Sequence, residues 1–156
     1  MCVCAEVPAF ELKEDPKAAF IYNGLKTDGG WLLALDQGRL EIEKELGWKI
    51  PYTESVGEAI SEIKPAVELF IRRGFNIIIG STYGYSEAFK ELAENYPNVA
   101  FLNAAGATNG SNLQSYFGRS YETAYLCGMV AGAMSKSGDL GMVAAHPLGL
   151  VNWEVN

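Results

Sequence analysis

The stretch Phe75-Asn-Ile-Ile-Ile79, which runs directly into Gly80, is the segment that decides the fold. It is apolar almost throughout, as a β-strand is when helices cover both faces of its sheet. The loop Gly80-Ser-Thr-Tyr-Gly-Tyr85 comes next, and a segment with helical spacing follows it. We therefore predict a buried parallel strand that leads through a short loop into a helix.

The same order of strand and helix recurs on both sides of this stretch. Further strands are expected at Lys17–Asn23, Pro51–Val56, Val99–Leu102 and Leu140–Ala145, with a short extended piece at Leu113–Phe117. Apolar residues at helical spacing predict helices over residues 31–46, 63–73, 89–96 and 121–134. On the first helix, Trp31, Leu35, Ile42 and Leu46 share one face. The second is expected to begin near Ile63, which puts Pro65 in its first turn.

Four strand–helix pairs closed by a fifth strand predict an α/β fold. Its expected core is a doubly wound, parallel five-stranded sheet in a flavodoxin-like lobe. A chain of 156 residues fits one domain better than two. We expect residues 1–16 to form an N-terminal extension, residues 17–147 a single α/β lobe, and residues 148–156 a tail.

Charge and cysteine content narrow the range of functions. The net charge is -7 and no run is rich in lysine or arginine, so a nucleic acid is not expected as a partner. Cys2 and Cys4 have no matching second pair, and the one histidine, His146, is far away in the sequence. Neither a metal nor a cofactor is therefore expected. Cys127 falls in an apolar helix and is expected in the core.

The start of the sequence shows no charged-then-apolar leader. No apolar run approaches the length of about 20 residues that a membrane-spanning helix needs. As it stands, the chain is expected in the cytoplasm, or as a processed or truncated form of an exported protein.

The loops after the predicted strands carry the candidate binding residues, because ligands of open parallel sheets bind at the carboxyl ends of the strands. Aromatic rings are offered by Trp31, Tyr83 and Tyr85, and hydrogen-bonding groups by Asp28, Ser81, Thr82 and Asn103. This set suits a neutral polar ligand with a flat ring. Structural alternatives stay open: Asp28 as a helix cap, Trp31 as a core anchor of its helix, and Asn103 as the end of its strand.

Catalytic patterns are missing from the sequence. One histidine and no Gly-x-Ser-x-Gly turn give no serine or cysteine triad, and neither type of glycine-rich phosphate loop is present. The chain is not expected to be an enzyme, and a small flavodoxin-like enzyme is the lesser alternative.

Three stretches resemble the basic membrane protein family, the substrate-binding components of importers for purine nucleosides and related purines. They are Phe20-Ile-Tyr followed by Asp28-Gly-Gly-Trp31, the series from Tyr116-Phe-Gly-Arg-Ser-Tyr-Glu to Ala131-Gly132, and Gly141-Met-Val-Ala-Ala-His-Pro147. The similarity runs from about Lys17 to the last residue, in the family's order and spacing.

The resemblance implies the N-terminal lobe of a type I periplasmic binding protein, which closes on its ligand together with a second lobe. By resemblance Asp28 contacts the ligand, Trp31 packs on the base, and the Ser81–Tyr85 loop and Asn103 are further binding positions. Contacts from the second lobe have no counterpart here, so binding of a purine nucleoside or base is expected to be weakened.

Assembly is the other consequence of the resemblance. The open cleft face and the tail after Pro147 are expected to support a homodimer. Family members are extracytoplasmic lipoproteins that deliver ligand to an ABC permease. The alternative is a regulatory or protein-interaction domain derived from the family, with no transport role.

Overall fold

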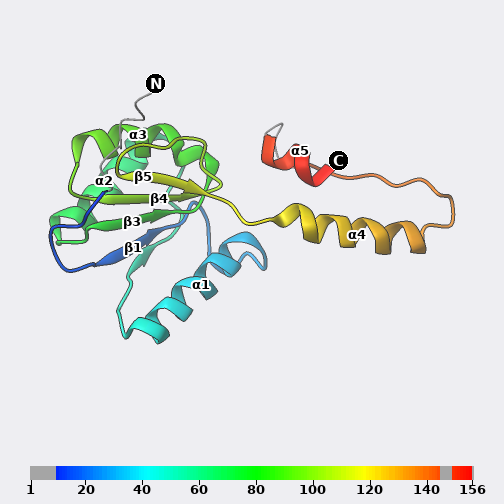
Figure 1. The fold of residues 1–156 in the computed structure, drawn as a ribbon, viewed down its shortest axis with the longest axis horizontal. Coiled ribbons are helices and arrows are strands. Elements are labelled where there is room, and N and C mark those ends of the chain that lie inside the picture. The colour runs from blue at the N-terminus through cyan, green and yellow to red at the C-terminus, as the bar shows by residue number, and fades with distance from the viewer. Residues whose placement is uncertain (1–9, 145–148, 156) are drawn as a thin grey trace, which may run out of the picture. The chain divides into compact units, whose positions relative to one another are not determined.

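A computed structural model of the chain describes residues 10–144 and 149–155 (Figure 1). Cys2, Cys4 and His146, for which sequence reasoning weighed metal binding or a structural role, lie outside the described residues. The chain forms two compact units, Met1–Tyr116 and Phe117–Asn156. The sequence led us to expect one lobe over residues 17–147.

The first unit is built on a parallel sheet of five strands in the order β2-β1-β3-β4-β5 (Figure 1). The strands are β1 (Ala18–Ile21), β2 (Tyr52–Thr53), β3 (Ile77–Gly80), β4 (Ala100–Ala104) and β5 (Leu113–Tyr116). Every neighbouring pair is parallel. This is the flavodoxin-like order, so the predicted fold class is confirmed.

The fifth strand of the sheet is Leu113–Tyr116 and not the segment that the sequence predicted. The prediction of a strand at Leu140–Ala145 is wrong, since residues 139–144 have no regular secondary structure. The extended piece at Leu113–Tyr116 pairs with β4 instead, and Leu113 is buried in the core. A strand needs a neighbouring strand for its backbone hydrogen bonds, and β4 supplies them for Leu113–Tyr116. Val143, which the prediction placed in the fifth strand, is fully exposed.

Helices cover both faces of the sheet (Figure 1). They are α1 (Trp31–Leu46), α2 (Ile60–Arg72) and α3 (Ser86–Asn95), with a 3-10 turn η1 (Tyr83–Tyr85) before α3. Side chains of β1 alternate between the two layers: Ala19 and Ile21 pack with α2 and α3, whereas Phe20 and Tyr22 pack with α1. This alternation explains why the strands are apolar on both faces.

Helix α2 begins three residues before the expected start at Ile63. Its first residue is Ile60, and Pro65 lies inside the helix rather than in its first turn. Proline has no N–H to donate to the carbonyl of Ser61, four residues earlier, and Ser61 is exposed. Water can therefore bond that carbonyl. The burial of Ile63, Val67 and Phe70 stabilises the helix by more than the missing hydrogen bond at Pro65 costs.

Helix α1 packs on the sheet through a face that combines apolar and charged residues, and Leu35 packs beside the buried Leu32. Its buried residues are Leu32, Asp36 and Arg39, whereas Trp31, Ile42 and Leu46 of the apolar face noted in the sequence are exposed. The carboxylate of Asp36 accepts hydrogen bonds from Arg39 Nε at 2.7 Å and from the Tyr22 hydroxyl at 3.2 Å. Lys26 Nζ lies 3.4 Å from the same carboxylate.

Two further contacts complete this charged cluster. Arg39 Nη1 donates to the carbonyl of Ile50 at 3.1 Å and pairs with Glu43 Oε1 at 3.1 Å. Burial opposes the charge on Asp36, but the hydrogen bond and charge of Arg39 hold the pKa of this carboxyl below its ordinary value. Burial, and then the charge of Asp36, raise the pKa of the Tyr22 hydroxyl.

The second unit contains α4 (Ser120–Met134) and α5 (Gly149–Val155). The Ser120 hydroxyl donates to the Glu154 carboxylate. No residue of α4 is buried, although Leu126, Met129 and Val130 are apolar. Cys127, expected in the core, is exposed. Across residues 10–144 and 149–155, no helix combines the length and apolar character that crossing a membrane requires.

Replacing Asp36 tests whether the charged cluster holds α1 on the sheet. Asp36→Asn leaves the buried Arg39 with only Glu43 as a charged partner, so the free energy of unfolding should fall by about 3 kcal/mol. The stabilisation is complete above the ordinary pKa of 3.8 and is lost as the pH falls through the lower pKa of the folded state. The difference in free energy of unfolding between the wild type and Asp36→Asn should therefore become smaller below pH 3.8.

Urea denaturation at several pH values makes this measurement. Glu68→Gln is the matched control, because Glu68 pairs with Arg72 on the surface and its loss should cost less than about 1 kcal/mol. Equal effects of the two substitutions would show that the Asp36 cluster does not anchor the helix.

Candidate binding site at the carboxyl ends of the strands

The loops after β1 and β3 are joined by side-chain hydrogen bonds. The backbone N–H of Asn23 donates to Ser81 Oγ at 3.0 Å, and Ser81 Oγ donates to Asn23 Oδ1 at 3.0 Å. Ser81 is almost completely buried. The parallel pairing of β1 with β3 sets Ile21 opposite Gly80. Asn23 and Ser81, which follow these two positions, are therefore brought together. Sequence reasoning identified Ser81 but missed Asn23, whose position directly after the first strand was the available signal.

Trp31 lies at this edge with part of its ring open to solvent. Its indole Nε1 donates to the backbone carbonyl of Ser81 at 2.6 Å, and 43% of the residue is exposed. The hydrogen bond fixes the ring against the loop that follows β3. Trp31 therefore anchors the start of α1 and still presents an aromatic surface, so the two alternatives raised by the sequence are compatible.

Asp28 caps helix α1. Its carboxylate accepts hydrogen bonds from the backbone N–H groups of Gly30 at 2.8 Å, Leu32 at 2.9 Å and Leu33 at 3.0 Å. These bonds, that of Gly30 first, lower the pKa of Asp28. The capping alternative is thus realised in the structure, and the carboxylate remains at the surface where a ligand can also reach it.

Thr82 and Tyr83 lie in the turn that follows Ser81. Thr82 Oγ1 donates to Glu58 Oε1 at 2.7 Å and accepts from the Gly84 N–H at 3.4 Å, which caps η1. Tyr83 is exposed, so its ring is accessible at this edge. Glu58 is a residue that sequence reasoning missed, because its contact with Thr82 spans 24 positions.

Tyr85 is part of the core rather than of the open edge. It is 0% exposed, its hydroxyl donates to the carbonyl of Val56 at 2.6 Å, and its ring stacks on Phe89 with centroids 5.8 Å apart. Tyr83 and Tyr85 flank Gly84 and look alike in the sequence. The turn directs one ring outward and the other inward, so the ring of Tyr85 is not accessible to a ligand in this structure.

Asn103 lies at the end of β4 and is 0% exposed. Neither its Oδ1 nor its Nδ2 has a hydrogen-bond partner among the described residues. Each unpaired buried polar group costs about 1–3 kcal/mol. The alternative of a local side-chain bond that ends the strand is not realised, because both amide atoms are free of such bonds.

Backbone strain also gathers at this edge. Ser55 follows β2 and Ala105 follows β4, and both have φ of 57°, in the left-handed region that favours glycine. Strained residues of this kind cluster at functional sites in proteins. Among the described residues, no group of His, Cys, Asp and Glu side chains is arranged to hold a metal ion.

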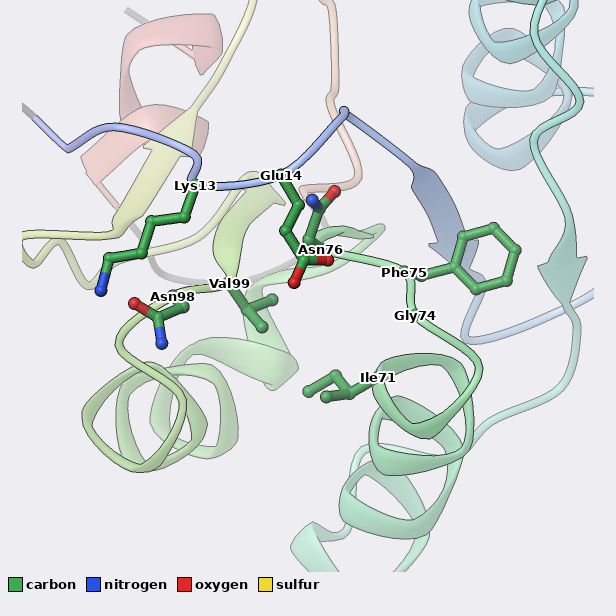
Figure 2. Close-up of a pocket in the computed structure, with 8 residues that line it drawn as sticks. All are labelled: Lys13, Glu14, Ile71, Gly74, Phe75, Asn76, Asn98 and Val99. Carbon is green, nitrogen blue, oxygen red and sulfur yellow. The ribbon is translucent and has the colours of Figure 1, made fainter.

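A hollow of about 210 Å³ lies at the opposite edge of the sheet (Figure 2). Lys13, Glu14, Asn76, Asn98 and Val99 help to line it. The Asn76 amide is already engaged, since its Oδ1 accepts from the Lys17 N–H at 2.8 Å and its Nδ2 donates to the Asp15 carbonyl at 3.0 Å. This hollow is at the amino ends of β3 and β4, whereas ligands of parallel sheets bind at the carboxyl ends.

Comparison with known proteins identifies the class. The sequence matches the family model described as ABC transporter substrate-binding protein PnrA-like over residues 15–156. The chain therefore belongs to this family of substrate-binding proteins, and the resemblance drawn from the three sequence stretches is confirmed. The family is one of binding proteins rather than of catalysts.

Individual relatives differ in what their names say they do. A protein of Haloferax volcanii, named as a glucose-binding protein of an ABC transporter, is 33% identical over 144 residues, which cover 92% of this chain and 36% of that protein. A purine-binding protein of Brucella abortus is 32% identical over 142 residues, which cover 90% of this chain and 40% of that protein. This chain thus spans less than half the length of either relative.

A solved structure with the same fold is a transcriptional activator of the comK gene from Bacillus halodurans. It superimposes with a TM-score of 0.70 at 25% identity, over 88% of this chain and 47% of that one.

The two tyrosines of η1 give a matched test of the site's boundary. Tyr85→Phe leaves the buried carbonyl of Val56 without its donor, so the free energy of unfolding should fall by about 1–3 kcal/mol. Tyr83→Phe removes a hydroxyl from an exposed ring and should change it by less than about 0.5 kcal/mol. Chemical denaturation measures both, and equal small effects of the two substitutions would show that the hydrogen bond from Tyr85 to Val56 does not stabilise the fold.

Proposed function

We propose that this chain supplies the first lobe of a solute-binding protein and holds one half of a site for a purine nucleoside or purine base. The observation that carries the proposal is the Trp31 ring, fixed by its bond to Ser81 and partly exposed at the carboxyl edge of the sheet. A fixed aromatic face is suited to stack on a flat ring. The relative named as a purine-binding protein supports this ligand class.

The polar groups around Trp31 fit a neutral ligand. Asp28 offers a charged acceptor at the surface, and the buried amide of Asn103 has both a donor and an acceptor unused. The hydroxyls of Ser81 and Thr82 are proposed to exchange their present bonds to Asn23 and Glu58 for bonds to the ligand. Tyr83 can supply a second ring. Tyr85, buried in the core, is left out of the proposed set. Recognition by hydrogen bonds and stacking requires no metal, cofactor or catalytic group.

The site is proposed to be completed by a second lobe. The chain leaves the sheet after β5, and the next unit begins at Phe117. Helix α4 is apolar and exposed along its length, which is typical of a helix that is covered in the complete protein. We therefore propose that the crossover to the second lobe lies near Phe117, whereas the sequence alone suggested that it starts with the tail over residues 148–156. The affinity of one lobe alone should be weak, because a single lobe leaves half the ligand in water.

The partners follow from this assignment. In a complete receptor the partner would be an ABC permease, and the location would be extracytoplasmic, as for the family. As a single lobe the chain is proposed to form a homodimer through the face that bears Trp31 and Tyr83, or through the tail.

A regulatory role is the second candidate. The likeness to a transcriptional activator, at a TM-score of 0.70, is the observation that favours it. With a net charge of -7, the chain would act through a protein partner rather than by contacting DNA itself. A ligand that changes association with such a partner, without any permease, would favour this role over transport.

Ligand binding tests the leading proposal through Trp31. Thermal unfolding is measured with added purine nucleosides and bases, and with pyrimidines and sugars as controls. The unfolding temperature should rise with ligand concentration for purines alone. Trp31→Ala should weaken binding by about 1–3 kcal/mol, the usual value of stacking on a base. Leu69→Ala, at an exposed residue of α2, is the control and should leave affinity unchanged.

Three results would overturn the assignment. A flat response from a well-folded protein would argue against any ligand site in this lobe. A response to sugars alone would move the ligand class toward that of the glucose-binding relative. Equal loss of affinity in Trp31→Ala and Leu69→Ala would show that binding does not depend on the carboxyl edge.

A further inference from the structure

The buried amide of Asn103 is enclosed by backbone on two sides. The register sets Asn103 opposite Gly80 of β3 and Ser115 of β5. A Cβ atom at Gly80 would lie 2.8 Å from Asn103 Oδ1, and one at Gly106 would lie 2.7 Å from Asn103 Nδ2. Only glycine at these two positions lets the chain close so tightly on the amide. The polar atoms are thus covered by groups that do not bond them.

The cover on one side is the connection between β4 and β5, residues 105–112 (Figure 1). Ser86, the first residue of α3, holds this loop. Its Oγ accepts from the Ala107 N–H at 3.0 Å, and its carbonyl accepts from Thr108 Oγ1 at 2.8 Å. Ser115 holds the same part of the loop, since its Oγ donates to the Thr108 carbonyl at 2.5 Å. Asn112 fixes the end of the loop, because its Nδ2 donates to backbone carbonyls that include those of Ala93 and Val99. These side-chain hydrogen bonds fasten the loop to its neighbours, and none of them includes the amide of Asn103.

The closed loop therefore has opposing contributions. Its hydrogen bonds to Ser86 and Ser115 favour closure. Two unpaired amide atoms on Asn103 and the left-handed backbone of Ala105 oppose it. Opening would relieve the cost at Nδ2, because water or a ligand could then accept a hydrogen bond from the amide. A segment with such a balance is suited to exist in two states.

We infer that residues 105–112 form a gate over Asn103, latched by Ser86, and that ligand binding holds the gate open. The open state presents the amide donor of Asn103 at the carboxyl edge, because Gly106 of the loop lies on the Nδ2 side of the amide. That donor is complementary to a hydrogen-bond acceptor on the ligand, such as a ring nitrogen or carbonyl at the edge of a purine base. The identity of this ligand rests on the proposed function, whereas the gate itself does not.

Hydrogen exchange without ligand tests the gate directly. Ser86→Ala removes the acceptor of the Ala107 N–H, so exchange across residues 105–112 should rise by about threefold to tenfold. Asn103→Leu removes both unpaired atoms and should slow exchange there by a similar factor. Ser111→Ala is the control, since Ser111 is an exposed serine of the same loop whose hydroxyl is directed at Asn112. Asn103→Ala replaces Asn103→Leu if the larger side chain prevents folding.

Binding of a purine nucleoside, measured by calorimetry, is the second arm. Ser86→Ala should bind several-fold more tightly, because a larger share of the protein is already open. Asn103→Leu or Asn103→Ala should bind more weakly.

The two proposals fail in different ways. If the wild type binds no purine, the ligand class is wrong and the exchange data still decide the gate. If exchange in residues 105–112 is the same in the Ser86 and Asn103 variants as in the wild type, the gate is wrong, whatever the protein binds.

Discussion

The parallel pairing of β1 with β3 is the constraint on which the site depends. Its register sets Phe20 opposite Ile79 and Ile21 opposite Gly80, so that both strands end at the same level. The loops that follow must then meet, and the hydrogen bonds between Asn23 and Ser81 join them. The indole of Trp31 bonds the carbonyl of that same serine. Because crossovers bury both faces of such a sheet, this edge is where polar side chains can converge.

The attachment of α1 shows how charge and not only apolar contact sets the geometry. Asp36 and Arg39 face the sheet as a buried pair, with the Tyr22 hydroxyl as a third member. The helix is thereby rotated so that Trp31 and Ile42 lie outside the buried face. A buried pair of this kind adds little net stability over an apolar contact, but it specifies one orientation. In this protein that orientation places the tryptophan at the loop after β3.

The second unit contains a helix, α4, that has no buried residue. Helix α4 is apolar and exposed, and the relatives are more than twice as long as the segments they share with this chain. Both observations support the proposal that a second lobe completes the ligand site. The same proposal accounts for the exposed aromatic ring and for the strained loop residues Ser55 and Ala105 at the carboxyl edge of the first unit.

The sequence by itself determined the parallel α/β fold, because apolar strands and amphipathic helices are local patterns with distinct periods. It also determined that Asp28, Trp31, Ser81 and Asn103 follow strands or begin a helix at the carboxyl edge. Tertiary structure alone decided which segment became the fifth strand, since Leu113–Tyr116 gained β4 as a neighbour and Leu140–Val143 did not. It alone separated Tyr83 from Tyr85, and it alone left the amide of Asn103 buried without a partner, because burial and hydrogen bonding depend on residues distant in the chain.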